Sequence, residues 1–315
     1  MNAVFMGTPE IAGPCLRAVV EWAGGRVRVV TQPDRPVGRS GQPQPPPVKV
    51  AAAELGLEVV QPLKLRGNAG FLAWLTADPP DLMVVVAFGQ ILPPPVLEVP
   101  PRGCLNVHFS QLPKYRGAAP VQWALINGET VTAVDVQKMD AGLDTGDVLA
   151  SEPVAIEPGE TAGELFARLG DLAPRVLLAT LKEWSAGRLS PQPQDSARAT
   201  LAPRLSKEEG RLDWNRPTAE LFNRWRGVTP WPGATAVVAG EEVKVLRAEL
   251  GQTALAGAEP GALLALEPER GLLVAAGGGA LWLTRLQAPG RKPVSGAEYA
   301  RGRRLEVRRE IRYDR

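Results

Sequence analysis

The sequence predicts an α/β fold in which a mostly parallel sheet is followed by a second, smaller domain of antiparallel strands. Through the first 190 of the 315 residues, short apolar runs alternate with windows of helical periodicity, which is the pattern of parallel strands joined by helices. Beyond about residue 206, short alternating strands are separated by turn residues, which is typical of a small β-barrel.

The expected strands of the first domain are short and apolar. They cover residues 3–6, 27–30, 82–87 and 105–107, and the helices between them are expected at 11–22, 48–55 and 69–75. Because the run at 82–87 contains no polar residue, we expect its strand to be buried on both faces at the centre of the sheet.

A longer helix is expected to close the first domain. The Thr161 hydroxyl can cap its first turn while Glu164 reaches back to the backbone of Thr161. Gly187 can end the helix after about Ser185. This helix places the end of the first domain near residue 189.

The remaining chain divides at a change in composition. Residues 190–206 are rich in Pro, Gln, Ser and Ala, which predicts an extended linker. We therefore expect a catalytic domain at 1–189 and a second domain at 207–315. In the second domain, a short helix near 217–226 precedes strands whose turns are expected at 239–240, 269–271 and 277–279.

Composition excludes several classes of protein. No uncharged apolar run approaches the roughly 18–20 residues that span a bilayer, and the N-terminus has no leader pattern, so we expect a cytoplasmic monomer without membrane contact. Two distant cysteines, Cys15 and Cys104, exclude a disulfide framework or a Cys-rich zinc site. His108 is the sole histidine. We expect no metal, and any chemistry that needs imidazole must use His108.

Basic residues are unevenly distributed along the chain. Residues 1–190 hold 16 Lys and Arg against 19 Asp and Glu, and residues 191–315 hold 20 against 15, so the net charges are −3 and +5. The last 25 residues alone hold nine basic residues against four acidic ones. A basic second half suits a polyanionic partner, while an ordinary solvated surface is the alternative that charge alone leaves open.

A Pro-rich stretch at 32–47 interrupts the first domain after its second strand. Loops longer than about 12–15 residues inside compact domains are usually functional. A tolerated surface insertion is the alternative.

Common nucleotide and hydrolase motifs are absent. The first strand runs into Gly7-Thr8-Pro9 rather than GxGxxG, and neither GxxxxGK[ST] nor GxSxG occurs. The triplet Asp144-Thr145-Gly146 is similar to that of aspartic proteases, which need two such aspartates sharing a proton, whereas this chain has one copy. Dinucleotide, P-loop and protease functions therefore lose their main support.

One group of polar residues stands out at the end of a predicted strand. Asn106 and His108 project from the same face because side chains alternate along a strand, and ligands of open α/β sheets bind at the carboxyl ends of strands. An amide and an imidazole there can stabilise an oxyanion or carry a proton. Asp144, in a Gly-punctuated loop, can hold His108 in its charged form. Taken singly, each residue fits a structural role equally well.

Two longer segments carry a resemblance that makes this group specific. NVHFSQLPKYRGAAPVQW, at 106–123, and QKMDAGLDTGDVL, at 137–149, closely resemble the signature of the 10-formyltetrahydrofolate-dependent formyltransferases. Further similar segments run from residue 4 to the end of the chain. The resemblance implies a Rossmann-like catalytic domain, an OB-like barrel that binds tRNA, and transfer of the formyl group of 10-formyltetrahydrofolate to the methionine of initiator Met-tRNA.

The resemblance also implies roles for particular residues. The catalytic group is implied to be Asn106, His108 and Asp144. The folate site is implied to include Phe88, Ile91, Leu92, Ser110, Gln111, Leu112, Pro113 and Asp140. The cationic residues that we expect to bind tRNA are Arg39, Lys207, Arg301, Arg303, Arg304 and Arg308.

This chain departs from the family pattern in two places. Phe109 and Gln111 replace a small residue and a leucine after the histidine, which puts details of the folate pocket in doubt. In the loop at 32–47, Arg39 is the main cation after Gly38, where relatives are often richer in lysine. A loop with fewer cations is expected to contact fewer phosphates of the tRNA. Each lost contact lowers the slope of the salt dependence of binding by roughly one counterion.

Three other functions compete with this one. A formyltransferase that acts on a nucleotide sugar would share the Asn, His and Asp group, but the second domain and the segment at 205–214 speak against it. A hydrolase that passes the formyl group to water has no use for a basic second domain. A tRNA-binding protein without catalysis would not need all of Asn106, His108 and Asp144.

Overall fold

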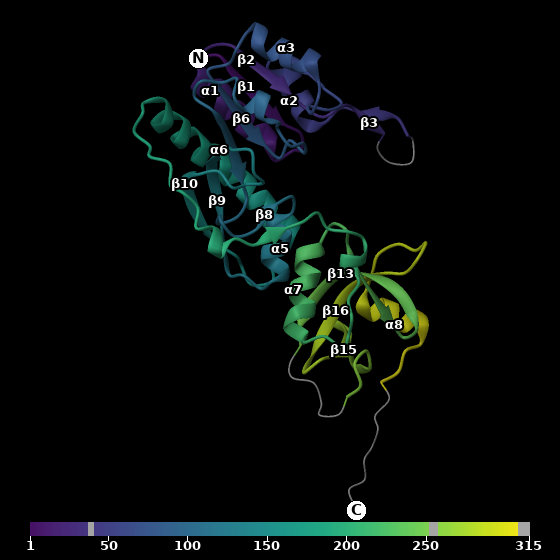
Figure 1. Ribbon diagram of the computed structural model, residues 1–315. Coiled ribbons are helices and arrows are strands. Elements are labelled where there is room, and N and C mark those ends of the chain that lie inside the picture. The colour runs from purple at the N-terminus through teal and green to yellow at the C-terminus, as the bar shows by residue number, and fades with distance from the viewer. Residues whose placement is uncertain (37–40, 252–257, 308–315) are drawn as a thin grey trace, which may run out of the picture. The chain divides into compact units, whose positions relative to one another are not determined.

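The computed structural model describes residues 1–36, 41–251 and 258–307 (Figure 1). The chain forms two compact units. The first contains Met1–Pro120, Val131–Ala155 and Phe166–Pro203, and the second contains Val121–Thr130, Ile156–Leu165 and Arg204–Arg315. Two short segments that precede residue 189 therefore pack with the second unit. The boundaries at 189 and 207 remain a prediction.

The first unit is built on a seven-stranded sheet, which is mostly parallel as predicted. The strand order is β10-β9-β7-β6-β1-β2-β5, and only β9 and β10 pair antiparallel to their neighbours. Their bounds are β1 (Ala3–Gly7), β2 (Val27–Val30), β5 (Glu58–Val60), β6 (Leu82–Val86), β7 (Cys104–His108), β9 (Val131–Lys138) and β10 (Val148–Ala155). Every residue of β6 is buried, which confirms the prediction of a central strand.

Helices alternate with these strands along the chain. They are α1 (Ala12–Ala23), α2 (Pro47–Glu54), α3 (Ala69–Ala77), α4 (Pro94–Leu97), α5 (Pro120–Ile126) and α6 (Ala162–Ser185). One apolar core joins β1 and β6 to α3 and α4 through side chains such as Met6, Val85, Phe71 and Val96. Among the described helices, none is both long enough and apolar enough to cross a membrane.

The predicted capping of the long helix is confirmed. The Thr161 N–H donates to Glu164 Oε2 at 2.8 Å, and the Glu164 N–H donates to Thr161 Oγ1 at 3.4 Å. Gly187, just beyond the helix, has a φ of +69°. A proline, Pro174, lies inside the helix, a feature that the sequence pattern did not indicate.

The segment at 190–203, which we name the connector, is hydrogen-bonded to the first unit rather than free. Gln192 and Val148 exchange two backbone hydrogen bonds of 2.9 Å. Further on, β11 (Leu201–Ala202) pairs in parallel with β8 (Arg116–Gly117). Backbone groups of the connector are thus satisfied by strands and loops of the first unit, and the bounds of the linker at 190 and 206 stay a prediction.

The second unit contains an antiparallel sheet, as predicted. Its main order is β12-β13-β16-β15-β14, and β17 pairs with β16. The bounds are β12 (Ala234–Val238), β13 (Glu241–Leu250), β14 (Leu263–Glu267), β15 (Gly271–Ala276), β16 (Gly279–Gln287) and β17 (Val294–Ser295), with helices α7 (Thr218–Val228) and α8 (Gly296–Arg303). The turn at Ala239 and Gly240 has positive φ at both residues, 50° and 81°, which is the geometry of a tight hairpin.

The Pro-rich loop at 32–47 is anchored at both ends. Its described flanks, β3 (Arg35–Pro36) and β4 (Pro43–Gln44), pair antiparallel. Lys49 Nζ donates to both carboxylate oxygens of Asp34 at 2.8 Å. The base of the loop is therefore a short ribbon tied to α2, and Arg39 lies outside the described residues.

Candidate active site

The site is built at the carboxyl end of β7, where Asn106 and His108 project from one face of the strand. In the antiparallel pairing with β9, Asn106 lies opposite Gln137 and His108 lies opposite Asp135. Directly opposed residues of neighbouring strands point to the same face of a sheet. Four polar side chains therefore gather on one face of the sheet, and all four are buried.

Asp144 reaches this group from the loop between β9 and β10. Its Oδ1 accepts a hydrogen bond from Gln137 Nε2 at 2.8 Å and a longer one from Asn106 Nδ2 at 3.4 Å. Its Oδ2 accepts from the Gly117 N–H at 2.9 Å and lies 3.8 Å from His108 Nδ1. The structure thus brings Asn106, His108 and Asp144 together, although 36 residues separate His108 from Asp144 in the sequence.

The hydrogen bonds of His108 decide which ring nitrogen carries the proton. Nε2 lies 3.0 Å from the carbonyl oxygen of Tyr115. Because a carbonyl oxygen can only accept, Nε2 must be the donor, and this assignment fixes the tautomer of the neutral ring. Nδ1 is then the nitrogen that faces Asp144. Because Nε2–H is committed to the Tyr115 carbonyl oxygen, a ligand can contact this imidazole at Nδ1.

This arrangement can stabilise negative charge on a carbonyl oxygen. The amide nitrogen of Asn106 is a hydrogen-bond donor, and Nδ1 of His108 lies 3.8 Å from the same Asp144 carboxylate to which Asn106 donates. Both side chains are largely shielded from water, with 9% and 5% of their residue surface exposed. Hydrogen bonds aimed at developing charge are stronger in such surroundings than in water. The chemistry that fits is attack of a nucleophile on a carbonyl carbon.

The sequence pattern missed several residues that support this group. Gln137 holds the Asp144 carboxylate, and Gln194 of the connector donates to the carbonyl oxygens of Asp144 and Gly146 at 2.9 and 2.6 Å. Asp135 accepts hydrogen bonds from Leu112 N at 2.7 Å and from the Ser151 hydroxyl at 2.5 Å. The available signal was the alternation of Asp135 and Gln137 in an apolar strand. Nothing local in the connector indicated Gln194.

The carboxyl group of Asp135 has a clearly altered acidity. It is 1% exposed, and this burial raises the pKa of its carboxyl to about 6, against the lowering effect of its two hydrogen-bond donors. Its ordinary pKa is about 3.9. Between about pH 4 and 6 the folded state therefore binds more protons than the unfolded state, so this residue lowers the free energy of unfolding as the pH rises through that window.

We expect the substitution Asp135→Asn to gain stability relative to the wild type as the pH rises from 4 to 7. The amide of asparagine keeps an acceptor for the Leu112 N–H but cannot ionise. The variant therefore does not show the fall in the free energy of unfolding that ionisation of Asp135 causes in the wild type, which is about 3 kcal/mol for a shift of about two pKa units. Urea unfolding of both proteins at pH 4, 5, 6 and 7 measures the difference. A stability difference that does not change with pH would contradict the expectation.

The residues that the resemblance assigns to folate lie in different surroundings. Phe88 and Leu92 are buried in the apolar core, with 2% and 3% of their surface exposed, whereas Ile91 is 76% exposed. Of these three side chains, Ile91 is therefore the one exposed at the surface, while Phe88 and Leu92 pack in the core beneath the loop. The Phe88 carbonyl oxygen accepts from Thr8 Oγ1 at 2.9 Å, which fixes this loop to the end of β1.

The loop after His108 is also held in place. Ser110 is buried, and its hydroxyl donates to the Lys114 carbonyl oxygen at 2.7 Å. Leu112 is held by Asp135, while Gln111 is exposed and Pro113 is partly exposed. Asp140 is exposed and accepts from Gly142 N at 3.0 Å and Thr145 Oγ1 at 2.6 Å. Asp140 therefore shapes the loop that carries Asp144.

The cations assigned to tRNA fall into three groups. Lys207, Arg301 and Arg304 are exposed. Arg303 is also exposed, but it is committed to Glu241, with Nη2 to Oε1 at 2.6 Å and Nε to Oε2 at 2.9 Å. Arg39 and Arg308 lie outside the described residues. Lys207, Arg301 and Arg304 therefore have the charge most available to a phosphate.

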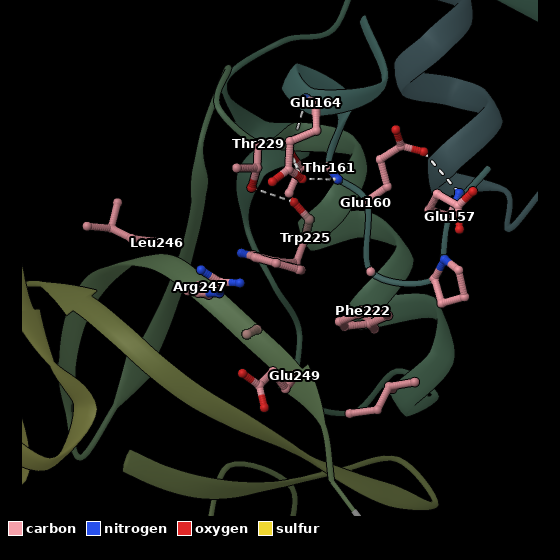
Figure 2. Close-up of a pocket in the computed structure, with 14 residues that line it drawn as sticks. Glu157, Glu160, Thr161, Glu164, Phe222, Trp225, Thr229, Leu246, Arg247 and Glu249 are labelled. Atoms are coloured by element: carbon pink, nitrogen blue, oxygen red, sulfur yellow. Dashed lines mark hydrogen bonds between the residues drawn. The ribbon is translucent and has the colours of Figure 1, made fainter. Parts of the chain in front are cut away.

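A separate hollow of about 780 Å³ lies in the second unit. Figure 2 shows it between the loop at 157–164, helix α7 and strand β13. Its lining includes the aromatic rings of Phe222 and Trp225 and the carboxylates of Glu157, Glu160, Glu164 and Glu249. These acids would repel a phosphate backbone. The hollow holds none of the residues assigned to catalysis.

No group of three or more His, Cys, Asp or Glu side chains in the described part of the chain is placed to hold a metal ion. The donors at the end of β7 are instead an amide and an imidazole beside one carboxylate. This is a set that suits an organic carbonyl group.

Comparison with known proteins defines the class. Residues 1–181 match the family model described as formyl transferase, and residues 204–304 match the model described as formyl transferase, C-terminal domain. The fold and both matched regions are those of a formyl transferase.

Relatives of known function cover almost the whole chain. A methionyl-tRNA formyltransferase of Sorangium cellulosum is 45% identical over 307 residues, which are 98% of each chain. One of Solibacter usitatus is 47% identical over 97% of this chain and 96% of its own. The chain belongs to the methionyl-tRNA formyltransferase family, a family of transferase enzymes.

Solved structures support the fold. HypX from Aquifex aeolicus, solved with tetrahydrofolic acid, aligns with a TM-score of 0.62 at 19% identity over 98% of this chain, which spans about half of HypX (48%). An N-formyltransferase from Helicobacter canadensis, solved with folinic acid and dTDP-3-aminofucose, aligns with a TM-score of 0.68 at 16% identity over 91% of this chain and 99% of its own. At these identities the likeness concerns the fold alone.

Proposed function

We propose that this enzyme transfers the formyl group of 10-formyltetrahydrofolate to the α-amino group of methionine on initiator Met-tRNA, at the site formed by Asn106, His108 and Asp144. The observation that carries the proposal is the meeting of these three side chains at the end of β7. Its chemistry suits a carbonyl group, and the full-length relatives transfer formyl groups to methionyl-tRNA.

In the proposed reaction, the neutral amine attacks the formyl carbon. A new C–N bond forms to the amine, the bond from the formyl carbon to N10 of the folate breaks, and one proton passes from the amine to N10. Asn106 and the Nδ1–H of His108 donate hydrogen bonds to the formyl oxygen as its negative charge grows. Asp144 holds the charged imidazole and orders a water that assists the proton transfer to N10.

The residues fit the formyl donor in two respects. A formyl oxygen needs hydrogen-bond donors, and Asn106 and His108 supply them on one face of β7. The flat pterin needs an apolar surface, and Ile91 and Leu143 offer exposed side chains, with 76% and 53% of their surface accessible. When bound, the folate supplies an activated formyl group. The protein orients that group and shields it from water.

We propose that the enzyme is active as a monomer. Because its acceptor is an aminoacyl-tRNA used in translation, we place it in the cytoplasm. Analytical ultracentrifugation at the concentrations used for assays tests the first point. Activity found only in a dimer fraction would contradict it.

We propose that Lys207, Arg301 and Arg304 contact the phosphate backbone of the tRNA. Replacing Arg301 and Arg304 by alanine is expected to weaken binding and to reduce the slope of log K against log salt by up to about two, because each cation that neutralises a phosphate releases roughly one counterion. Arg303→Ala is expected to change the slope less, since its guanidinium is bonded to Glu241.

Filter binding of initiator tRNA at several salt concentrations measures these slopes. Arg17→Ala is the control, because Arg17 is exposed in the first unit and pairs with Glu54 at 2.7 Å. A slope that is the same in the Arg301 and Arg304 variant as in the wild type would assign these arginines to ordinary surface.

The direct test of the proposed function is transfer of labelled formyl from 10-formyltetrahydrofolate. Initiator Met-tRNA, elongator Met-tRNA and a 4-amino nucleotide sugar are offered in parallel. We expect label on the initiator tRNA alone. Label on the sugar but on neither tRNA would overturn the proposed acceptor while leaving the donor site intact.

A further inference from the structure

The connector contacts both loops that bring groups to His108. Thr200 Oγ1 accepts a hydrogen bond from the N–H of Tyr115 at 2.8 Å, and the Tyr115 carbonyl oxygen accepts from His108. Six residues earlier, the side chain of Gln194 bonds to the backbone of the loop that carries Asp144. A segment whose composition predicts a linker is therefore packed behind the active site.

Gln194 makes four hydrogen bonds with its one amide group. Its Oε1 accepts from Arg116 Nε at 3.0 Å and from Arg116 Nη2 at 2.8 Å. Its Nε2 donates to the carbonyl oxygens of Asp144 and Gly146 at 2.9 and 2.6 Å. Because a guanidinium can only donate, Oε1 must face Arg116 and Nε2 must face the two carbonyls. Arg116 therefore fixes the orientation of the amide.

The backbone of Asp144 needs such support. Its φ of +51° lies in the left-handed region, which is disfavoured for a residue with a side chain and persists where surrounding contacts impose it. The donor on the Asp144 carbonyl is Gln194, and the donor on Oδ2 is the N–H of Gly117, the residue after Arg116. Arg116, Gln194, Asp144 and Gly117 thus form a closed ring of contacts.

We infer that Gln194 is a positioning residue for formyl transfer. It acts through Asp144, by holding the left-handed backbone that points the carboxylate at His108 and Asn106. This inference rests on the proposed function, because the consequence for turnover depends on the role of Asp144. Gln194 itself does not touch the reacting atoms.

The first test compares three variants. Gln194→Ala is expected to lower kcat about 10- to 100-fold, because misplacing a catalytic group by about 1 Å can cost about 100-fold, while the KM values for Met-tRNA and folate change by less than about threefold. Gln194→Glu keeps the acceptor for Arg116 but loses the donor to the Asp144 carbonyl, so it is expected to be as impaired. Gln192→Ala is the matched control, since that side chain is exposed and bonds to the Ser190 carbonyl oxygen.

A double-mutant cycle separates positioning from general weakening. If Gln194 acts through Asp144, adding Gln194→Ala to Asp144→Asn lowers kcat little further, whereas independent effects multiply. The inference would be overturned if the losses in kcat of the two single variants multiply in the double variant, or if Gln194→Glu has the kcat of the wild type. Thermal unfolding of each variant shows whether a loss of activity is caused by misfolding.

A measurement independent of activity distinguishes this inference from the proposed function. The Gly117 amide is protected by Asp144 Oδ2 in the wild type, so its hydrogen exchange reports whether the carboxylate is held. We expect faster exchange at Gly117 in Gln194→Ala and unchanged exchange in Gln192→Ala. Unchanged exchange in Gln194→Ala would overturn the inference. A wild-type enzyme without formyl transfer to tRNA would instead overturn the proposed function.

Discussion

Replacing His108 by alanine is expected to lower kcat for formyl transfer by about two to three orders of magnitude, the loss seen when one donor to an oxyanion is removed. The affinity for tRNA is expected to stay near the wild-type value, because the imidazole lies at the end of β7 and is 5% exposed. The loss therefore concerns the transition state rather than binding of the large substrate.

The size of this effect follows from the hydrogen bonds of the ring. Nε2–H is fixed on the Tyr115 carbonyl oxygen, so the ring cannot turn freely, and Nδ1 is held toward Asp144 and the proposed position of the formyl oxygen. Alanine removes this preorganised ring and leaves the Asp144 carboxylate without the imidazole beside it. Asn106 remains as a neutral donor, which is why we expect residual turnover rather than none.

Cys104→Ala is the matched control for this experiment. Cys104 lies on the same strand and face as His108 and is buried in the apolar core. Its replacement by alanine removes buried volume and lowers the stability of the protein, but it leaves the donors at the end of the strand unchanged. We expect it to melt earlier but to keep near wild-type kcat at temperatures where it is folded. Single-turnover formyl transfer and tRNA binding measure both variants. Full activity in His108→Ala would refute the role assigned to the imidazole.

The sequence predicted those parts of the fold that are determined by local patterns. The strands β1, β2, β6 and β7 are buried along their whole length and consist mostly of apolar residues, so short apolar runs mark them in the sequence. The long helix α6 was predicted from Thr161 and Glu164, whose hydrogen bonds are local. By contrast, β5 has three residues at the edge of the sheet and none is buried, so no apolar run marks it.

The site was predictable only in part for a related reason. Alternation placed Asn106 and His108 on one face, but the distance to Asp144 depends on the antiparallel pairing of β7 with β9, which no local pattern specifies. Gln194 shows the limit more clearly. Its role depends on where a Pro- and Gln-rich segment folds back, and its composition is equally compatible with a free linker.

Replacing Asp144 by asparagine is expected to lower kcat by about two to four orders of magnitude. In other enzymes, kcat falls by up to about four orders of magnitude when the aspartate that partners a catalytic imidazole is replaced by asparagine. Asparagine matches aspartate in size but carries no charge, and one of its two terminal groups is a donor. In this site, Gln137 and Asn106 donate to Oδ1 and the Gly117 N–H donates to Oδ2, so an amide must set its NH₂ against at least one donor.

Two consequences of Asp144→Asn reinforce each other. The imidazole of His108 loses the carboxylate that lies 3.8 Å from its Nδ1, so the support for positive charge on the imidazole in the transition state is removed. The mismatch with Gly117 or Gln137 also shifts the loop, which weakens the orientation of any ordered water. Because both effects act on the transition state, we expect kcat and kcat/KM to fall together.

Asp147→Asn, in the same loop, is the control, and we expect it to retain near wild-type turnover. The measurement is the rate of formyl transfer under single-turnover conditions, with folate and tRNA binding determined separately for each variant. A fall confined to tRNA affinity would move Asp144 from catalysis to binding. If Asp147→Asn lowers the rate of formyl transfer as much as Asp144→Asn does, the effect comes from loop structure, because removal of a negative charge elsewhere in the loop would then have the same result.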